Sequence, residues 1–309
     1  MIRRLIIILL LQQVTVAYAE TGHGPYKPQG SYVNFDIYSL YYHCEGGRGP
    51  TAVIEGGIGY SLAEWQPIQQ ALAPHLRTCV YDRAGYGMSY RGNGARTAAQ
   101  IADELYDLLK VADIPGPYIL VGHSFGGYVV QYFAKKNPHL VAGMVLVDSS
   151  HPDQVHRLAE LDAISNNEYR GLINGQTPVT SIKPEDAQSY WHMLNRQRKA
   201  IFTQMDELKY FRESAEQVRD AGVFPDIPLA VITRGQQLLP ATEEGHSLEQ
   251  EWRDMQRELV TLSKQGWQTV AANSGHSIHI DAPDVVIEEV LRVLDKVTEP
   301  AKYSGVRNN

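Results

Sequence analysis

Short apolar runs alternate with amphipathic stretches along most of the chain, and this rhythm limits the possible folds more than any other feature. The runs between residues 51 and 148 are apolar throughout, whereas the stretches between them repeat apolar residues at helical spacing. A strand without polar positions is buried on both faces, as in a parallel sheet that helices cover on both sides. The alternation therefore predicts an α/β fold with a mostly parallel, doubly wound sheet.

Eight strands and five helices are expected in the core. The strands are predicted at residues 33–36, 38–44, 51–55, 78–82, 118–121, 141–148, 229–233 and 269–272. The helices are predicted at residues 62–76, 98–112, 125–136, 248–264 and 284–297.

Residues 151–226 interrupt the alternation with a polar, helical sequence in which no strand pattern is evident. We expect a helical cap here, inserted between the two parts of the core, residues 20–150 and 227–298. Residues 299–309 are expected to form a loose C-terminal tail.

Residues 1–19 have the pattern of a secretory signal peptide, because Arg3 and Arg4 precede an apolar run and Ala17-Tyr18-Ala19 matches a cleavage site. The run is shorter than the ~20 residues that cross a bilayer, and no later run is longer. We therefore expect an exported protein, periplasmic or extracellular, with no integral membrane segment after cleavage. A short anchor that stays attached is the alternative.

The composition is that of an ordinary globular protein, with 43% hydrophobic and 20% charged residues. The formal net charge is −7 and no basic residues cluster, which argues against a nucleic-acid partner. No group of histidines, carboxylates and thiols has the spacing of a metal site, so neither a metal nor another cofactor is expected. The expected partner is a small-molecule substrate, and the oligomeric state stays open.

A serine stands between glycines in the segment Gly122-His123-Ser124-Phe125-Gly126-Gly127. The segment follows a predicted strand and opens a predicted helix, and this sharp turn exposes the serine oxygen at the edge of a sheet. Ser124 is therefore the candidate nucleophile, and the backbone N–H of Phe125 is a candidate oxyanion donor. A glycine-rich turn with an uninvolved serine is the alternative.

With four other segments in fixed order, this motif resembles the α/β-hydrolase superfamily from about residue 31 to residue 297. The resemblance implies an eight-stranded, mostly parallel sheet with an inserted cap and a serine, histidine and acid triad. The other segments are Glu55-Gly56-Gly57-Ile58-Gly59, Asp82-Arg83-Ala84-Gly85-Tyr86-Gly87-Met88-Ser89, Leu146-Val147-Asp148 and Gly275-His276.

The resemblance also assigns the base and the acid. The family carries its catalytic imidazole in a Gly-His pair after the last strand, which is His276 here, with His279 as the rival. Many members carry the acid after the seventh strand, but residues 233–240 contain no carboxylate. Other members place it at the end of the sixth strand, where this chain has Asp148. Glu243 and Glu244 are the alternatives.

In the first oxyanion loop, Gly56 replaces the histidine that is common in the family. By alignment the N–H of Ile58 is the second oxyanion donor. The resembled fold also places the second strand antiparallel to the fourth, which brings Cys44 near Cys79 and implies a disulfide rather than two buried thiols. Asp82 and Arg83 are expected to be structural.

These features favour an exported serine hydrolase, similar to carboxylesterases and lipases, that cleaves carboxylic esters through an acyl-enzyme intermediate. A serine nucleophile argues against the dehalogenase and epoxide hydrolase branches, which attack with an aspartate. The cap is expected to set substrate choice, with Trp191 or Phe202 either in an acyl pocket or in the core of the cap.

Two other functions remain open. An aminopeptidase similar to the proline iminopeptidases needs a cap carboxylate for the substrate amine, and Glu160, Glu168 and Glu207 are candidates. A member of the fold that binds a ligand or partner without catalysis is the other. The acyl chain, the leaving group, ester against amide preference and the physiological role are not encoded in any motif.

Overall fold

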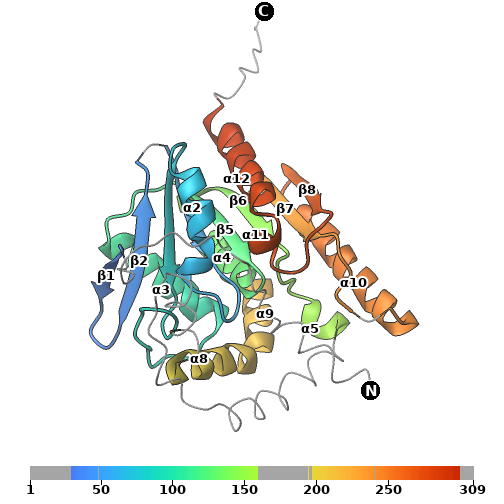
Figure 1. Ribbon diagram of the computed structural model, residues 1–309, viewed down its shortest axis with the longest axis horizontal. Helices are drawn as coiled ribbons and strands as arrows, with labels where there is room; N and C mark the ends of the chain where they lie inside the picture. Colours follow the sequence, from blue (N-terminus) through green and yellow to red (C-terminus); the bar gives the residue numbers. More distant parts are fainter. Residues whose placement is uncertain (1–28, 48, 159–193, 195–196, 240, 300–309) are drawn as a thin grey trace, which may run out of the picture.

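The computed structural model describes residues 29–47, 49–158, 194, 197–239 and 241–299, and its centre is one eight-stranded sheet (Figure 1). The strand order is β1-β2-β4-β3-β5-β6-β7-β8. β1 and β2 run antiparallel to their neighbours and every other pair is parallel, so the predicted fold class is confirmed. The strands are β1 Ser31–Asn34, β2 Ser39–Glu45, β3 Thr51–Glu55, β4 Arg77–Asp82, β5 Tyr118–His123, β6 Val141–Val147, β7 Leu229–Arg234 and β8 Gly266–Ala271.

Helices cover both faces of the sheet (Figure 1). On one face α3 and α4 pack together and α10 packs on β7, whereas α2 and α12 pack together on the other face. The helices are η2 Leu62–Trp65, α2 Gln66–Leu72, α3 Ala98–Val111, α4 Phe125–Lys136, η3 Pro138–Leu140, α5 Gln154–Arg157, α8 Arg198–Lys209, α9 Phe211–Asp220, α10 Glu243–Val260, α11 Ile278–Asp281 and α12 Pro283–Thr298.

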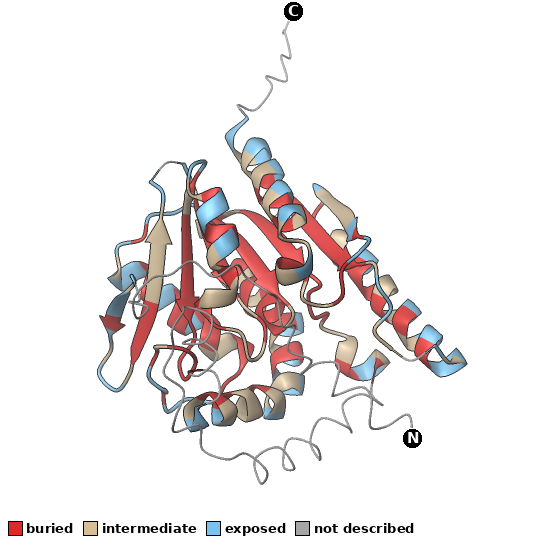
Figure 2. Ribbon diagram, in the orientation of Figure 1, coloured by how far each residue is buried: buried red, intermediate tan, exposed pale blue. Residues whose placement is uncertain are grey.

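Two hydrophobic cores lie on opposite faces of the sheet. Ile101 and Leu105 of α3 join Phe133 of α4 in one core, and Ile68 of α2 joins Val290 of α12 in the other. Strands β3, β5 and β7 are buried at every position, which explains why their central residues are apolar (Figure 2). The edge strand β8 is mostly half-buried.

Several element boundaries differ from the sequence prediction, most of them by one to three residues, and two helices differ by more. The helix predicted at residues 62–76 is the short 3-10 helix η2 followed by α2. Helix α10 begins at Glu243 rather than at residue 248, because the hydroxyl of Thr242 accepts a hydrogen bond from the N–H of Gly245 (3.1 Å) and caps the helix.

Only parts of the predicted cap lie within the described residues. They are α5, α8 and α9, and α9 packs against α3 and α4 of the core. The predicted signal peptide, residues 1–19, and residues 300–309 of the predicted tail lie outside the described residues. In the part of the chain that the structure describes, no helix is both long and apolar enough to traverse a bilayer.

Cys44 and Cys79 form a disulfide between β2 and β4. The two residues face each other directly in the antiparallel ladder, which is the arrangement that the resemblance implied. The bond ties the outer pair of strands to the parallel part of the sheet. No free cysteine remains in the chain, because its two cysteines form this bond.

Removing this disulfide should destabilise the fold. The bond closes a loop between residues 35 positions apart. In the chain-entropy model its loss lowers the free energy of unfolding by about 3–4 kcal/mol. Urea unfolding of the double variant Cys44→Ala/Cys79→Ala and of the parent checks this, and a thiol reductant should have no effect on the variant. An unchanged midpoint in the double variant would contradict it.

Candidate active site

Ser124 lies at the sharp turn between β5 and α4, with φ of 52° and ψ of −123°. This conformation is strained for a residue with a side chain and persists where the surroundings enforce it. The N–H of Ser124 donates to the carbonyl of Val147 (3.2 Å), and its own carbonyl accepts from Ser150 (3.0 Å). The turn is therefore held from the adjacent end of β6.

Gly126 allows α4 to approach the end of β3. A Cβ at this position would lie 2.4 Å from the carbonyl oxygen of Glu55 and 2.5 Å from that of Gly56. The first turn of α4 and the loop after β3 therefore touch through their backbones. This contact brings the predicted oxyanion loop to Ser124.

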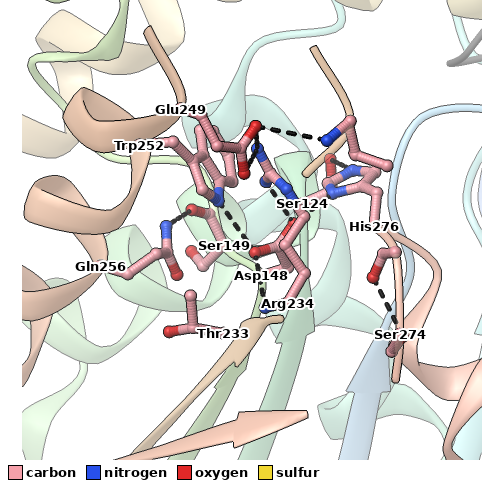
Figure 3. A network of polar contacts seen from close by, with 12 residues as sticks. Ser124, Asp148, Ser149, Thr233, Arg234, Glu249, Trp252, Gln256, Ser274 and His276 are labelled. Carbon is pink, nitrogen blue, oxygen red and sulfur yellow. Dashed lines mark hydrogen bonds and ion pairs between the residues drawn. The ribbon is translucent and has the colours of Figure 1, made fainter. Parts of the chain in front are cut away.

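His276 connects Ser124 to Asp148 (Figure 3). Its Nε2 lies 2.9 Å from Oγ of Ser124, and its Nδ1 lies 2.6 Å from Oδ2 of Asp148. The three residues follow β5, β6 and β8, and parallel strands end at the same edge of the sheet. We refer to Ser124, His276 and Asp148 as the candidate triad.

Asp148 is fully buried and has several hydrogen-bond donors around it (Figure 3). Arg234 donates to Oδ2 (2.8 Å), and Trp252 Nε1 donates to Oδ1 (2.9 Å). Burial by itself would raise the pKa of Asp148. The charge of Arg234 and the hydrogen bonds from His276 and Trp252 outweigh burial and hold that pKa below its usual range. Asp148 is therefore a carboxylate that only accepts hydrogen bonds.

The sequence analysis missed Arg234, Trp252 and Glu249. Arg234 lies between two carboxylates, because its Nη2 also pairs with Glu249 (3.2 Å), and its guanidinium stacks on Trp252 at 4.5 Å from the ring centre. The available signal was the segment 233–240, at and after the end of β7, which contains an arginine and no carboxylate.

The alternative base and acids have no contact with Ser124 among the described interactions. His279 is buried beside the candidate triad, stacked on Trp65 with ring centres 4.3 Å apart, and neither of its ring nitrogens has a hydrogen-bond partner in the described residues. Glu243 and Glu244 form the first turn of α10, where carboxylates interact favourably with the helix dipole. The structure brings His276 and Asp148, rather than these residues, to Ser124.

His123 supports the loop that carries His276. Its Nε2 lies 2.9 Å from the carbonyl oxygen of His276, so the neutral ring donates there. Burial, followed by the neighbouring His276, lowers the pKa of His123 to about 3. His123 is therefore uncharged at neutral pH.

Two backbone N–H groups are available beside Ser124, those of Ile58 and Phe125. Within the described residues neither N–H donates a hydrogen bond. The N–H of Phe125 opens α4, where unpaired donors and the helix dipole favour negative charge. A Cβ at Gly57, next to Ile58, would lie 3.1 Å from Cβ of Ser124. Both predicted oxyanion donors thus belong to segments in contact with Ser124.

Asp82 and Arg83 have separate structural partners. Asp82 accepts from the N–H groups of Leu62 and Met88, both at 2.9 Å. Arg83 is buried and pairs with Glu55 (2.7 Å) and with Glu207 of α8 (3.0 Å). Glu207, one of the cap carboxylates considered for a substrate amine, is therefore already occupied.

The structure gives little information on the other residues that were considered for substrate binding. Phe202 is 38% exposed and lies under the guanidinium groups of Arg91 and Arg198. Trp191, Glu160 and Glu168 lie outside the described residues.

One group of three possible metal ligands occurs in the described part of the chain, His151, Asp153 and Glu258. Glu258 already pairs with Arg157 and Asp153 with Arg219, both at 2.7 Å, so we assign no metal to this group.

A model of the alpha/beta hydrolase family matches residues 56–289, which include the whole candidate triad. The chain belongs to this family. One family relative, the uncharacterized protein YqjL of Bacillus subtilis strain 168, is 31% identical over 246 residues, which are 79% of this chain and 83% of that protein.

Solved structures of hydrolases share the fold. A putative lipase from Acinetobacter baumannii has a TM-score of 0.59 at 19% identity and covers 87% of this chain and 91% of its own. A thermophilic esterase from Thermogutta terrifontis has a TM-score of 0.58 at 20% identity and covers 87% of this chain and 99% of its own. The TM-scores show a common fold, and identities this low leave the substrate open.

Replacing Arg234 should strongly lower the free energy of unfolding of the protein. In Arg234→Met, Asp148 and Glu249 stay buried without their cation, and breaking such a pair costs about 3–5 kcal/mol. The matched control is Arg219→Met, whose pair with Asp153 is substantially exposed and should be worth about 0–1 kcal/mol. Denaturant unfolding at neutral pH measures both, and equal losses would contradict the prediction.

His279 should make the fold sensitive to acid. Burial, followed by His123 and His276, lowers its pKa well below the usual value, so the native state does not bind a proton that the unfolded state binds. Stability should therefore be complete above about pH 6.5 and fall below it, by up to ~1.4 kcal/mol per pH unit for this residue. Unfolding measured from pH 4 to 8 should show a shallower acid slope in His279→Phe. An unchanged slope would refute this account.

Proposed function

We propose that this protein is a serine hydrolase that cleaves carboxylic esters. The observation that carries the proposal is the continuous series of hydrogen bonds from Ser124 through His276 to Asp148, beside two N–H groups that have no partner among the described residues. A serine needs such a base, an orienting acid and oxyanion donors to act as a nucleophile at neutral pH. A protein that only binds a ligand does not need a serine, a base, an orienting acid and oxyanion donors in one place.

In this proposal Ser124 Oγ attacks the ester carbonyl carbon while His276 Nε2 accepts the hydroxyl proton. Asp148 holds the ring through Nδ1 and stabilises the imidazolium. The N–H groups of Ile58 and Phe125 donate to the oxyanion. His276 then passes the proton to the leaving alcohol, an acyl-serine forms, and water activated by the same imidazole releases the acid and restores Ser124.

Ester hydrolysis is favoured over the aminopeptidase alternative. The esterase and lipase among the structural neighbours support ester chemistry on this fold. The aminopeptidase needs an available cap carboxylate, and Glu207 is buried and paired with Arg83. We also propose that the protein is exported, because disulfides form and persist mainly in oxidising compartments outside the cytosol.

Hydrolysis of p-nitrophenyl esters from acetate to palmitate tests the proposal. The parent should hydrolyse at least the shorter esters. Ser124→Ala, His276→Ala and Asp148→Asn should each lower kcat at least about a hundredfold, which is roughly 2.7 kcal/mol of transition-state stabilisation. Each variant is compared with the parent at equal folded concentration.

Amino-acyl anilides provide the contrast. A parent that cleaves anilides and no ester would favour the aminopeptidase, and a parent that cleaves neither would reject the hydrolase proposal. If Asp148→Asn keeps its activity while Ser124→Ala and His276→Ala lose theirs, another residue is the acid. Glu243 and Glu244 would then be tested next.

A further inference from the structure

Arg83 links the cap to the backbone of the oxyanion loop, residues 56–59. Its guanidinium is buried between two carboxylates, Glu55 at the end of β3 and Glu207 in the cap helix α8. Glu207 holds it in a two-pronged contact, with Nε and Nη2 each 3.0 Å from one carboxylate oxygen. This planar fork fixes the direction of the remaining N–H groups of Arg83.

Those remaining N–H groups bind the oxyanion loop directly. Nη1 donates to the carbonyl of Gly56, and Nη2 donates to the carbonyl oxygen of Gly57 at 2.7 Å. The carbonyl of Gly57 and the N–H of Ile58 belong to one planar, trans peptide unit, so they point in opposite directions. Fixing the carbonyl of Gly57 therefore fixes the direction of the proposed oxyanion donor.

The same contact strengthens that donor. A cation at the carbonyl end of a peptide draws electron density toward the oxygen and leaves the N–H more positive. Arg83 thus both aims and polarises the N–H of Ile58, and no reorganisation is needed when negative charge develops on the substrate oxygen.

Glu207 also reaches the other side of Ile58. The hydroxyl of Tyr86 donates to Oε2 of Glu207 (2.7 Å) and accepts from the N–H of Gly59 (3.1 Å). One cap carboxylate is therefore connected to the peptide before Ile58 through Arg83 and to the N–H after it through Tyr86.

We propose that Glu207 is a positioning residue, by which the cap helix α8 sets the direction and donor strength of the Ile58 N–H in the oxyanion hole. The inference rests on the proposed function, because it concerns the same Ser124-centred site. It assigns the cap a part in transition-state stabilisation in addition to any part in substrate choice.

The test compares Glu207→Gln with Asp206→Asn, the adjacent residue on the same helix. Gln keeps the shape of Glu but turns an NH₂ group toward one of the donors that Glu207 binds, which breaks the fork. Asp206 pairs with Arg91 at the surface, outside this network, so Asp206→Asn makes the same chemical change on α8 without touching the oxyanion loop.

The readouts are kcat and KM for a p-nitrophenyl ester and the affinity for phenylboronic acid, which forms a tetrahedral adduct with the serine. Rates are normalised to the fraction of sites that react in a burst titration. We expect Glu207→Gln to lower kcat about tenfold or more and boronic-acid affinity by a similar factor, with KM within about twofold. Asp206→Asn should stay within about twofold in all three. A loss of reactive sites alone, or a change in KM alone, would overturn the proposal.

Tyr86→Phe provides a second variant in case Glu207→Gln does not fold. It removes only the hydroxyl that joins Gly59 to Glu207 and should lower kcat and boronic-acid affinity in parallel by a smaller factor. Full kcat in a folded Tyr86→Phe, or in a folded Glu207→Gln, would overturn the proposal and leave the hydrolase function standing.

An activity-independent readout separates the two hypotheses. The amide resonance of Ile58 should shift in Glu207→Gln and in Tyr86→Phe and stay in place in Asp206→Asn, because the direction and polarisation of this N–H depend on the network. A parent without hydrolase activity would reject the proposed function, and an unmoved Ile58 resonance would reject the role of Glu207.

Discussion

The structure of the site depends on keeping the buried carboxylate of Asp148 charged at the edge of the sheet. Asp148 lies at the end of β6 without exposure to solvent, and a lone carboxylate there would take up a proton. Arg234 and Trp252 provide the donors that keep it ionised. In that form both oxygens of Asp148 accept hydrogen bonds, and Oδ2 accepts the Nδ1 hydrogen of His276, whose Nε2 lies toward Ser124.

A similar arrangement of an arginine between two carboxylates occurs a second time, beside the other half of the site. Arg83 lies between Glu55 and Glu207, as Arg234 lies between Asp148 and Glu249. In each case a buried arginine joins a residue at the end of a strand to a carboxylate on a helix. A planar guanidinium with five donors can satisfy two carboxylates and backbone carbonyls at once, which an ammonium group cannot do.

The sequence predicted what is encoded locally. Burial on both faces makes parallel strands apolar throughout, and the strand, GHSFGG and helix order located Ser124. The start of α10 was also encoded, because Thr242 followed by Glu243 is a helix N-terminal signal, yet the apolar spacing alone placed the start too late. The partners of Arg83 and Arg234 were not predictable, because they come from elements distant in sequence and any of several carboxylates has the right chemistry.

Burial and catalysis impose opposite demands on this edge of the sheet. Catalysis by the proposed triad needs a charged carboxylate and aimed N–H groups, whereas removal of water makes each unpaired charge costly. Charge pairing across elements resolves the conflict, and it has a geometric consequence. With Arg83 held by Glu207, the carbonyl of Gly57 accepts from Arg83 in the orientation that points the N–H of Ile58 away from Arg83. The interactions that make the buried charges tolerable are then the same ones that orient the proposed oxyanion donor.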